Sequence, residues 1–192
     1  MIFCVTNRSL CKADFLQQLR RIAAAKPDAI VLREKMLSED AYMQMAEQVF
    51  SICQENQVQL ICNTFIRVAE RLAVPVQISF STLSQTDSLS VPFGVSVHSV
   101  EEAIRAEQAG AAFLIAGHIF ATACKPDLPP RGLLFLQEIC QAVSIPVLGI
   151  GGIHVQNAAS ILQTGAAGFC IMSDFMQTDA PEWMMQQLRK LC

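Results

Sequence analysis

"AAFLIAGH", residues 111–118, is an apolar run that ends in a single histidine. It does not alternate between apolar and polar residues, and this is typical of a parallel strand buried on both faces. Similar runs recur along the chain, separated by longer segments with helical spacing. The expected strands are residues 2–7, 29–34, 59–63, 74–79, 93–98, 111–118, 145–152 and 166–173.

Helical patterns lie between most of these strands. Ser38 is a suitable N-cap for one helix, and Ser99 with Glu102 forms a capping-box pattern at the start of another. The stretch 80–92 has no helical pattern, so the fourth helix is expected to be short or missing. The other expected helices are residues 13–25, 38–56, 65–72, the segment that starts at Ser99, 131–143, 155–164 and about 180–191.

Eight strands that alternate with helices predict a compact (β/α)₈ TIM barrel, formed by residues 1–192 as a single domain. The alternative architecture is an open, doubly wound sheet. No G-x-G-x-x-G follows the first strand, and a count of eight strands favours closure.

Composition narrows the class of protein. Of the 192 residues, 52% are hydrophobic and 16% charged, which indicates a globular fold and argues against disorder. The net charge of −3, without any run of Lys or Arg, does not support a nucleic-acid partner. There is neither an apolar run of about 18 residues nor a signal-peptide pattern, so we expect a cytoplasmic protein without a membrane partner.

Cysteine spacing supports the same location. None of the cysteines forms a C-x-x-C pair, so neither a disulfide scaffold nor a zinc site is expected, and no metal ligand is assigned. Most lie in apolar segments, where a thiol behaves as a small hydrophobic group. The eight are Cys4, Cys11, Cys53, Cys62, Cys124, Cys140, Cys170 and Cys192.

The active site of a TIM barrel lies where its strands end, so polar residues there are candidates for the site. His118 ends the run quoted first, and Thr122 and Lys125 follow in the same loop. The other candidates at strand ends are Asn7, Arg33, Glu34, Lys35, Asn63, Ser96, His98, Gly151, Gly152 and Ser173.

Two of these groups suggest anion binding. The glycines of "GIGG" (149–152) leave backbone N–H groups uncovered before a helix, and Ser173 could add a hydroxyl. The alternative is a tight turn that needs glycine for its geometry alone. In "LREK" (32–35), Arg33 and Lys35 are either surface charges or partners of a carboxylate or phosphate.

His118 also has two interpretations. As one polar residue after an apolar run, it would be a hydrogen-bonded core histidine. At a strand end, it would lie in the partly desolvated mouth of the barrel, where an imidazole can transfer protons near neutral pH. The position in the predicted barrel favours the second interpretation.

Several ordered motifs together resemble the thiamine phosphate synthase/TenI superfamily. They are "LREK", "GVSVHS-x-E-E-A", "GHIF-x-T-x-C-K", "RG", "IPVLGIGGI" and "GAAGFCIMS", and the resemblance runs essentially from end to end. It implies a (β/α)₈ barrel that acts in thiamine biosynthesis on a small thiazole phosphate. Arg33, Lys35, Asn63 and Ser96 match the family's substrate positions.

The synthase branch couples a hydroxymethylpyrimidine diphosphate to a thiazole phosphate, with Mg²⁺ held by two aspartates. This sequence departs from that pattern: Val31 replaces a Gln, Thr64 replaces one Asp, and residues 76–84 lack the other. Without these carboxylates, Mg²⁺ binding is not expected, and Mg²⁺ would be the cofactor only under the synthase interpretation.

The TenI branch fits the loop after residue 117 better. His118 stands where synthases have Pro, and Cys124 where they have a second Thr. The resemblance implies a thiazole tautomerase without a cofactor, in which His118 is the acid/base that aromatises a thiazole phosphate carboxylate. The substrate phosphate would bind at Gly151, Gly152, Met172 and Ser173, and its other contacts would include Thr122, Cys124 and Lys125.

We therefore expect a TenI-type tautomerase that could be a homodimer. Three alternatives stay open. The first is a thiamine phosphate synthase with degraded metal ligands, the second a non-catalytic regulatory or ligand-binding relative, and the third a phosphate-binding barrel isomerase of another pathway.

Overall fold

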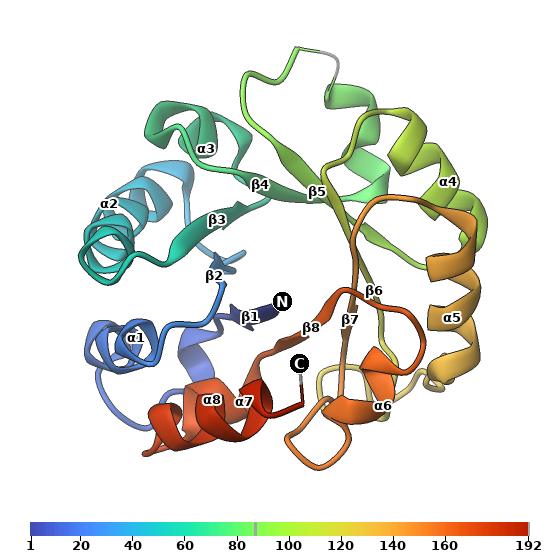
Figure 1. The fold of residues 1–192 in the computed structure, drawn as a ribbon. Helices are drawn as coiled ribbons and strands as arrows, with labels where there is room; N and C mark the ends of the chain where they lie inside the picture. Colours follow the sequence, from blue (N-terminus) through green and yellow to red (C-terminus); the bar gives the residue numbers. More distant parts are fainter. Residues whose placement is uncertain (87, 192) are drawn as a thin grey trace.

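The computed structural model describes residues 1–86 and 88–191, and its strands form one closed barrel (Figure 1). All neighbouring strands are parallel, and β1 pairs with both β2 and β8. The predicted TIM barrel is confirmed, and the open sheet is excluded. The strands are β1 (Ile2–Val5), β2 (Ala29–Leu32), β3 (Gln59–Asn63), β4 (Val76–Ser79), β5 (Phe93–Val97), β6 (Phe113–Gly117), β7 (Val147–Ile150) and β8 (Gly168–Ile171).

Helices surround the barrel in Figure 1. Between β4 and β5 the described residues form only the 3₁₀ helix η2 (Phe80–Gln85), which confirms that the fourth helix is reduced. A second 3₁₀ helix, η1 (Arg8–Leu10), follows β1. The α-helices are α1 (Phe15–Ala24), α2 (Glu39–Asn56), α3 (Ile66–Leu72), α4 (Val100–Gln108), α5 (Gly132–Ala142), α6 (Ala158–Leu162), α7 (Ser173–Gln177) and α8 (Pro181–Arg189).

The predicted helix caps are present. The Ser38 hydroxyl accepts from the Ala41 N–H at 3.3 Å, and the Ser99 hydroxyl accepts from the Glu102 N–H at 3.1 Å. The Glu102 carboxylate bonds one residue earlier than in a standard capping box, since it accepts from the His98 N–H at 2.6 Å. The short helix α7 was not predicted, because its first residue was assigned to the end of the preceding strand.

The interior of the barrel is filled with side chains. Phe3 and Phe113 meet edge to face, with ring centroids 5.8 Å apart, and Gly94 leaves the space that the Phe113 ring occupies. This inner core is a packed layer, as expected for a barrel of this size. Its buried members are Phe3, Val5, Ala29, Val31, Ile61, Phe113, Ile115, Leu148 and Cys170.

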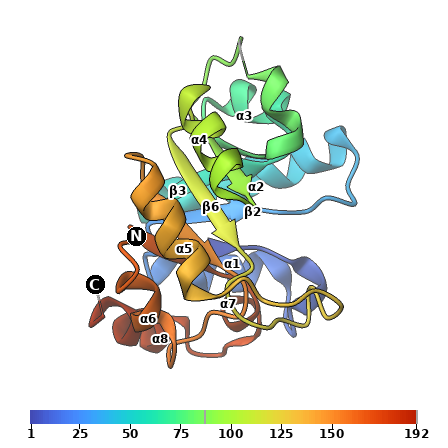
Figure 2. The same cartoon turned by 90° about the vertical axis from the view of Figure 1, so that its right-hand side faces the viewer.

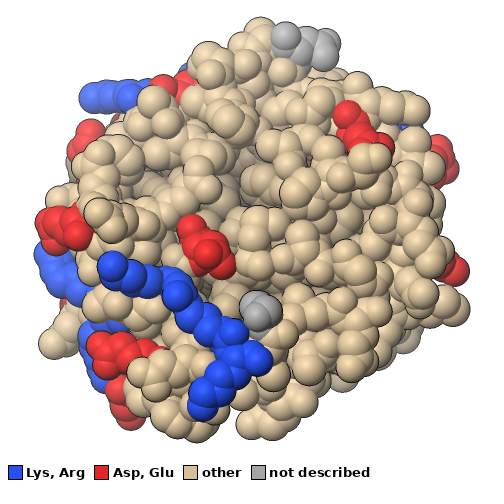
Figure 3. All heavy atoms as spheres, viewed as in Figure 1, with Lys and Arg blue, Asp and Glu red and all other residues tan. Residues whose placement is uncertain are grey.

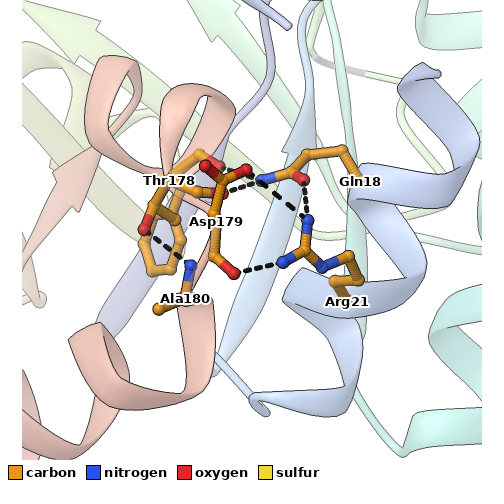
Figure 4. A network of polar contacts seen from close by, with 6 residues as sticks. Gln18, Arg21, Thr178, Asp179 and Ala180 are labelled. Atoms are coloured by element: carbon orange, nitrogen blue, oxygen red, sulfur yellow. Dashed lines mark hydrogen bonds and ion pairs between the residues drawn. The ribbon is translucent and has the colours of Figure 1, made fainter. Parts of the chain in front are cut away.

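The two ends of the chain are joined by polar contacts between α1 and the segment before α8 (Figure 4). The Gln18 amide donates to the carbonyl of Phe175 at 2.8 Å and to that of Thr178 at 2.9 Å. Arg21 donates to the Asp179 carbonyl and forms an ion pair with its carboxylate at 3.9 Å. These contacts close the ring of helices where the first and last units of the barrel meet.

The strands begin on the side that faces the viewer in Figure 1 and that lies on the left in Figure 2. Figure 3 shows this same face, with Lys and Arg side chains in a stripe over the region of α1 and α8. The strands end on the opposite side, where the loops after β2 and β6 project to the right in Figure 2. Any site at the strand ends therefore lies on the face that Figure 3 does not show.

Two further predictions concern thiols and membranes. The seven cysteines among the described residues are free, and Cys192 lies outside them. Cys4, Cys53, Cys62 and Cys170 are buried, and burial raises the pKa of each thiol. Among the described helices, none has the length and apolar character needed to cross a membrane.

Candidate active site

Alternation along the strands determines which predicted residues face the barrel axis. Val31 belongs to the inner core, so Arg33, two residues later, projects from the same face of the chain. The same reasoning places Asn63 two residues after Ile61. Polar side chains thus lie above the apolar core at the strand ends, where the sequence predicted the site.

The end of β2 is held by a carboxylate that faces away from the axis. The Thr6 hydroxyl accepts from the Arg33 N–H at 2.9 Å and donates to Glu34 Oε1 at 3.2 Å. The same carboxylate oxygen accepts from the Arg8 N–H at 2.9 Å. Glu34 therefore fixes the backbone beneath Arg33, and within residues 1–86 and 88–191 neither Arg33 nor Lys35 forms an ion pair with a carboxylate.

Three cations converge on this side of the mouth. The pKa of Lys35 is lowered from its ordinary value, mainly by desolvation and then by the nearby charges of Arg33 and Lys125. Arg33 and Lys35 come from the loop after β2, and Lys125 from the loop after β6. We call these three residues the cation cluster. A bound anion would favour the charged forms of these side chains.

A chain of amides and hydroxyls crosses β3, β4 and β5. The buried Asn63 donates from Nδ2 to the carbonyl of Gln77 at 3.2 Å and also to the Gln77 side-chain oxygen. Gln77 in turn donates from Nε2 to the hydroxyl of Ser96. Asn63 and Ser96 were predicted as site residues, whereas Gln77 was missed. Its signal was a polar amide between two buried apolar residues in "VQIS" (76–79).

Tyr42 supports Asn63 from the helix layer. Its ring is fully buried and stacks on Phe65, with centroids 4.0 Å apart. Its hydroxyl donates to the Leu32 carbonyl at 2.6 Å and accepts from the Asn63 N–H at 3.0 Å. Burial is the main cause of the strongly raised pKa of this phenol, so it stays a donor. α2 thus ties the ends of β2 and β3 together.

The loop after β6 lines an open hollow of about 380 Å³. Thr122 and Lys125 border the hollow, and the Thr122 side-chain oxygen accepts from the Cys124 N–H at 3.3 Å. Cys124 itself is exposed. The predicted contacts from this loop are therefore available to a ligand, with Lys125 as the only charged group that borders the hollow among the described residues.

His118 lies beneath this loop. Its side chain is only 5% exposed, and its Nε2 lies 3.2 Å from the carbonyl oxygen of Leu128, in the later part of the loop. The His118 carbonyl accepts from the Arg131 N–H at 3.0 Å. Both groups hold the loop closed on itself. The geometry matches the hydrogen-bonded core histidine that the sequence left as the alternative.

The glycine loop after β7 packs directly on the loop after β6. A Cβ at Gly151 would lie 2.4 Å from the Cβ of His118, and one at Gly152 would lie 2.4 Å from the Ala121 carbonyl oxygen. Both glycines have positive φ, +101° and +64°. Within residues 1–86 and 88–191, the amides of Gly152 and Ile153 donate to no other protein group, so they are available to an anion.

A side-chain pair that the sequence did not predict connects this loop to α7. The His154 ring nitrogen Nδ1 and the Asp174 carboxylate are 2.8 Å apart. Met172 and Ser173, the predicted phosphate residues after β8, directly precede Asp174 and are half-buried. The pair thus places the ends of β7 and β8 at one side of the mouth.

Comparison with known proteins bears on this arrangement. A family model described as thiamine monophosphate synthase matches residues 2–175. The chain belongs to this family. Thiamine-phosphate synthase from Coprothermobacter proteolyticus is 35% identical over 179 residues, which cover 90% of this chain and 85% of that protein. The synthase from Lacticaseibacillus paracasei is 36% identical over 195 residues, 98% and 92% of the two chains.

A solved structure agrees with these sequences. Thiamine phosphate pyrophosphorylase from Pyrococcus furiosus has a TM-score of 0.86 to this member of the thiamine monophosphate synthase family. The two chains are 27% identical, over 99% of this chain and 94% of the other.

The prediction of a TenI-type tautomerase was wrong. The full-length relatives and the solved structure are all named for the synthase reaction, which the sequence interpretation held only as an alternative. The physical reason lies in His118. Its position at the end of an apolar strand suggested an imidazole presented to substrate, whereas the ring is buried and bonded within its own loop.

Proposed function

We propose that this family member is a thiamine-phosphate synthase, a transferase that joins a hydroxymethylpyrimidine diphosphate to a thiazole phosphate. The observation that supports it best is the presence of two separate groups suited to anions at one mouth. One is the cation cluster, and the other is the glycine loop with its free amides. A reaction between two phosphorylated substrates needs two such groups.

The cation cluster would hold the diphosphate. Arg33 can form paired hydrogen bonds with phosphate oxygens, and the two lysines supply compact charge. The leaving diphosphate gains negative charge as its bond to carbon breaks, so these cations stabilise the transition state more than the substrate. Thr122, which borders the hollow, and the exposed Cys124 would contribute contacts from the same loop as Lys125.

The second substrate would bind on the opposite group. Gly151, Gly152, Met172 and Ser173 would hold the thiazole phosphate, mainly through backbone amides. Its ring nitrogen then attacks the methylene carbon of the pyrimidine, a C–N bond forms, and the C–O bond to diphosphate breaks. The nitrogen supplies the electron pair of the new C–N bond, and the diphosphate leaves with the electron pair of the broken C–O bond. Holding the two reactants in one mouth accelerates this step.

The family implies Mg²⁺, and the side chains at this mouth do not fit a protein-held magnesium ion. Mg²⁺ prefers carboxylate oxygens, yet the residues at the ends of β3 and β4 are the neutral Thr64 and Ser79. The Ser79 hydroxyl bonds to the hydroxyls of Ser81 and Thr82 at 2.8 and 2.6 Å. Among the described residues, no three His, Cys, Asp or Glu side chains gather in a metal-binding arrangement. We therefore assign no step to a protein-held metal.

Under this proposal His118 is a positioning residue. Its contacts with Leu128 and Arg131 shape the loop that carries Thr122 and Lys125. A buried imidazole that bonds to a main-chain carbonyl serves this purpose without exchanging protons with substrate.

Initial coupling rates test the proposal. Both substrates are varied together, and formation of thiamine phosphate is followed by chromatography. We expect the initial rate to depend on both substrate concentrations. Plots of reciprocal rate against reciprocal concentration should intersect, because both substrates must occupy the mouth together. Absence of product at every concentration, with and without added Mg²⁺, would contradict the proposal.

A further inference from the structure

Gln77 lies at the centre of the hydrogen-bond chain across the mouth. It is 6% exposed and pairs with Asn63 in the register of β3 and β4. Its side-chain oxygen accepts from Asn63, and its Nε2 donates to Ser96, so it bonds to one predicted substrate residue on each side. A buried amide with both ends occupied can fix the orientation of its neighbours.

Main-chain carbonyls decide the direction of this chain. The Gln77 carbonyl lies 3.2 Å from Asn63 Nδ2, and the Ile78 carbonyl lies 3.2 Å from Gln77 Nε2. A carbonyl can only accept, so turning either amide over would place two acceptors against each other. The Asn63 nitrogen must therefore face β4, and the Gln77 nitrogen must face Ile78 and Ser96.

This direction determines what the chain can offer to a ligand. With its nitrogen committed to β4, Asn63 retains Oδ1, which accepts from the Thr64 hydroxyl at the long distance of 3.3 Å and has capacity for a second donor. The Ser96 hydroxyl oxygen accepts from Gln77, so its own proton stays available. The mouth thus presents an acceptor at β3 and a donor at β5.

We propose that Gln77 is the positioning residue that makes this mouth select a ring carrying a hydrogen-bond donor beside an acceptor. An aminopyrimidine has this edge, with an exocyclic N–H₂ next to a ring nitrogen. The amine would donate to Asn63 Oδ1, and the ring nitrogen would accept from Ser96. This inference rests on the proposed function, since it assigns the pyrimidine substrate to the β3–β5 side of the mouth.

Equilibrium binding tests the role of Gln77. Isothermal calorimetry measures the pyrimidine diphosphate and the thiazole phosphate separately, with wild type, Gln77→Met and Gln77→His. Gln77→Met removes both polar ends at similar volume, and binding of the pyrimidine diphosphate should weaken by about tenfold or more. Binding of the thiazole phosphate should change by less than about twofold. Gln77→His can accept at one nitrogen and donate at the other, so it should restore part of the loss.

A pyrimidine diphosphate without the amino group separates selectivity from stability. Wild type should bind this analogue about tenfold more weakly than the amine, because Asn63 Oδ1 loses its donor. Gln77→Met should lose this discrimination. If Gln77→Met does not fold, Ser96→Ala takes its place, and it should weaken binding of both pyrimidine compounds while leaving the thiazole phosphate unaffected.

The outcomes distinguish the inference from the function on which it rests. The role of Gln77 alone would be overturned if Gln77→Met weakened binding of both substrates equally. It would also be overturned if wild type bound the pyrimidine diphosphate and its analogue without the amino group equally well. Failure of wild type to bind either phosphorylated compound would overturn the proposed function. The calorimetry needs no turnover, so the binding result stands whether or not coupling is detected.

Discussion

Gly152 is a residue at which the β7 loop packs tightly against the β6 loop. Its Cβ position would lie 2.4 Å from the Ala121 carbonyl oxygen and 2.9 Å from the Phe120 Cβ, and its φ is +64°. Such a contact with backbone cannot be relieved by rotating a side chain. The glycine is thus required by the packing of the two loops that carry the candidate site, in addition to leaving amides uncovered.

We predict that Gly152→Ala lowers the free energy of unfolding by about 2–4 kcal/mol, from the left-handed backbone and the overpacked contact together. Gly110→Ala is the matched control, since Gly110 also has a positive φ, +86°, but open space around its Cβ position. It should cost about 1–2 kcal/mol. Urea unfolding measures both, and equal losses would show that the loop contact has no energetic role.

Lys35 belongs to the cation cluster, and its pKa is lowered mainly by desolvation and then by the nearby charges of Arg33 and Lys125. We predict that Lys35→Met raises the melting temperature of the ligand-free protein slightly and weakens binding of inorganic diphosphate by about tenfold or more. A lowered lysine pKa means that the folded chain binds fewer protons than the unfolded chain between the two pKa values. Stability should therefore rise with pH across that window in wild type, and rise less in Lys35→Met.

Lys190→Met is the control for Lys35, since Lys190 is an exposed lysine that follows α8. It removes the same charge and should leave binding of diphosphate unchanged. Calorimetry and thermal unfolding over pH provide the data. If both variants lose affinity equally, net charge rather than the cation cluster determines binding.

Among single residues, the candidate charged groups and glycines could be predicted from the sequence. The orientation of a side chain at a strand end could not. Arg33 was predicted as a site residue at the end of a strand, and it follows the inner-core residue Val31 by two positions. For His118 the same strand-end position suggested exposure. Whether a ring at a strand end turns outward or beneath its loop depends on the later part of that loop, here the Leu128 carbonyl.

Among the elements, α2 supports the mouth through Tyr42. Through Tyr42 it satisfies a buried carbonyl at the end of β2 and a buried N–H at the end of β3. Removing the hydroxyl leaves both groups without a partner, and buried unpaired groups are costly.

We predict that Tyr42→Phe lowers the free energy of unfolding by about 1–3 kcal/mol and weakens binding of the pyrimidine diphosphate, because the main-chain N–H of Asn63 loses its partner. Thr164→Val is the control. Thr164 is also buried, and its hydroxyl donates to the Ile161 carbonyl at 2.7 Å, after α6. Thr164→Val should lower the free energy of unfolding without weakening binding of the pyrimidine diphosphate. Unfolding in urea and calorimetry check both effects, and unchanged binding in Tyr42→Phe would contradict the link from α2 to the mouth.

Element boundaries were predicted less well than element types. The strand expected over 145–152 forms only Val147–Ile150, because the chain bends at Ile145 and at the two glycines. Helix α7 was missed because its first residue, Ser173, was assigned to the end of the preceding strand. The reduced helix after β4 was predicted, since residues 80–92 lack an apolar face.

At the scale of the whole molecule, the closed barrel followed from eight continuous apolar runs. The predicted barrel also implies that the candidate residues lie together at one end, because they follow the ends of parallel strands. The branch of the superfamily could not be inferred in the same way. It was judged from the absence of two carboxylates and the presence of one histidine, and both features are also compatible with a synthase whose mouth relies on fixed cations.

We propose that this chain joins two phosphorylated substrates with release of diphosphate. Phosphorus NMR of one sample with enzyme, both substrates and Mg²⁺ follows every phosphorus atom at once. We predict that thiamine phosphate and inorganic diphosphate appear in equal amounts as both substrates disappear. Unchanged resonances, or loss of the pyrimidine diphosphate without formation of thiamine phosphate, would contradict this proposal.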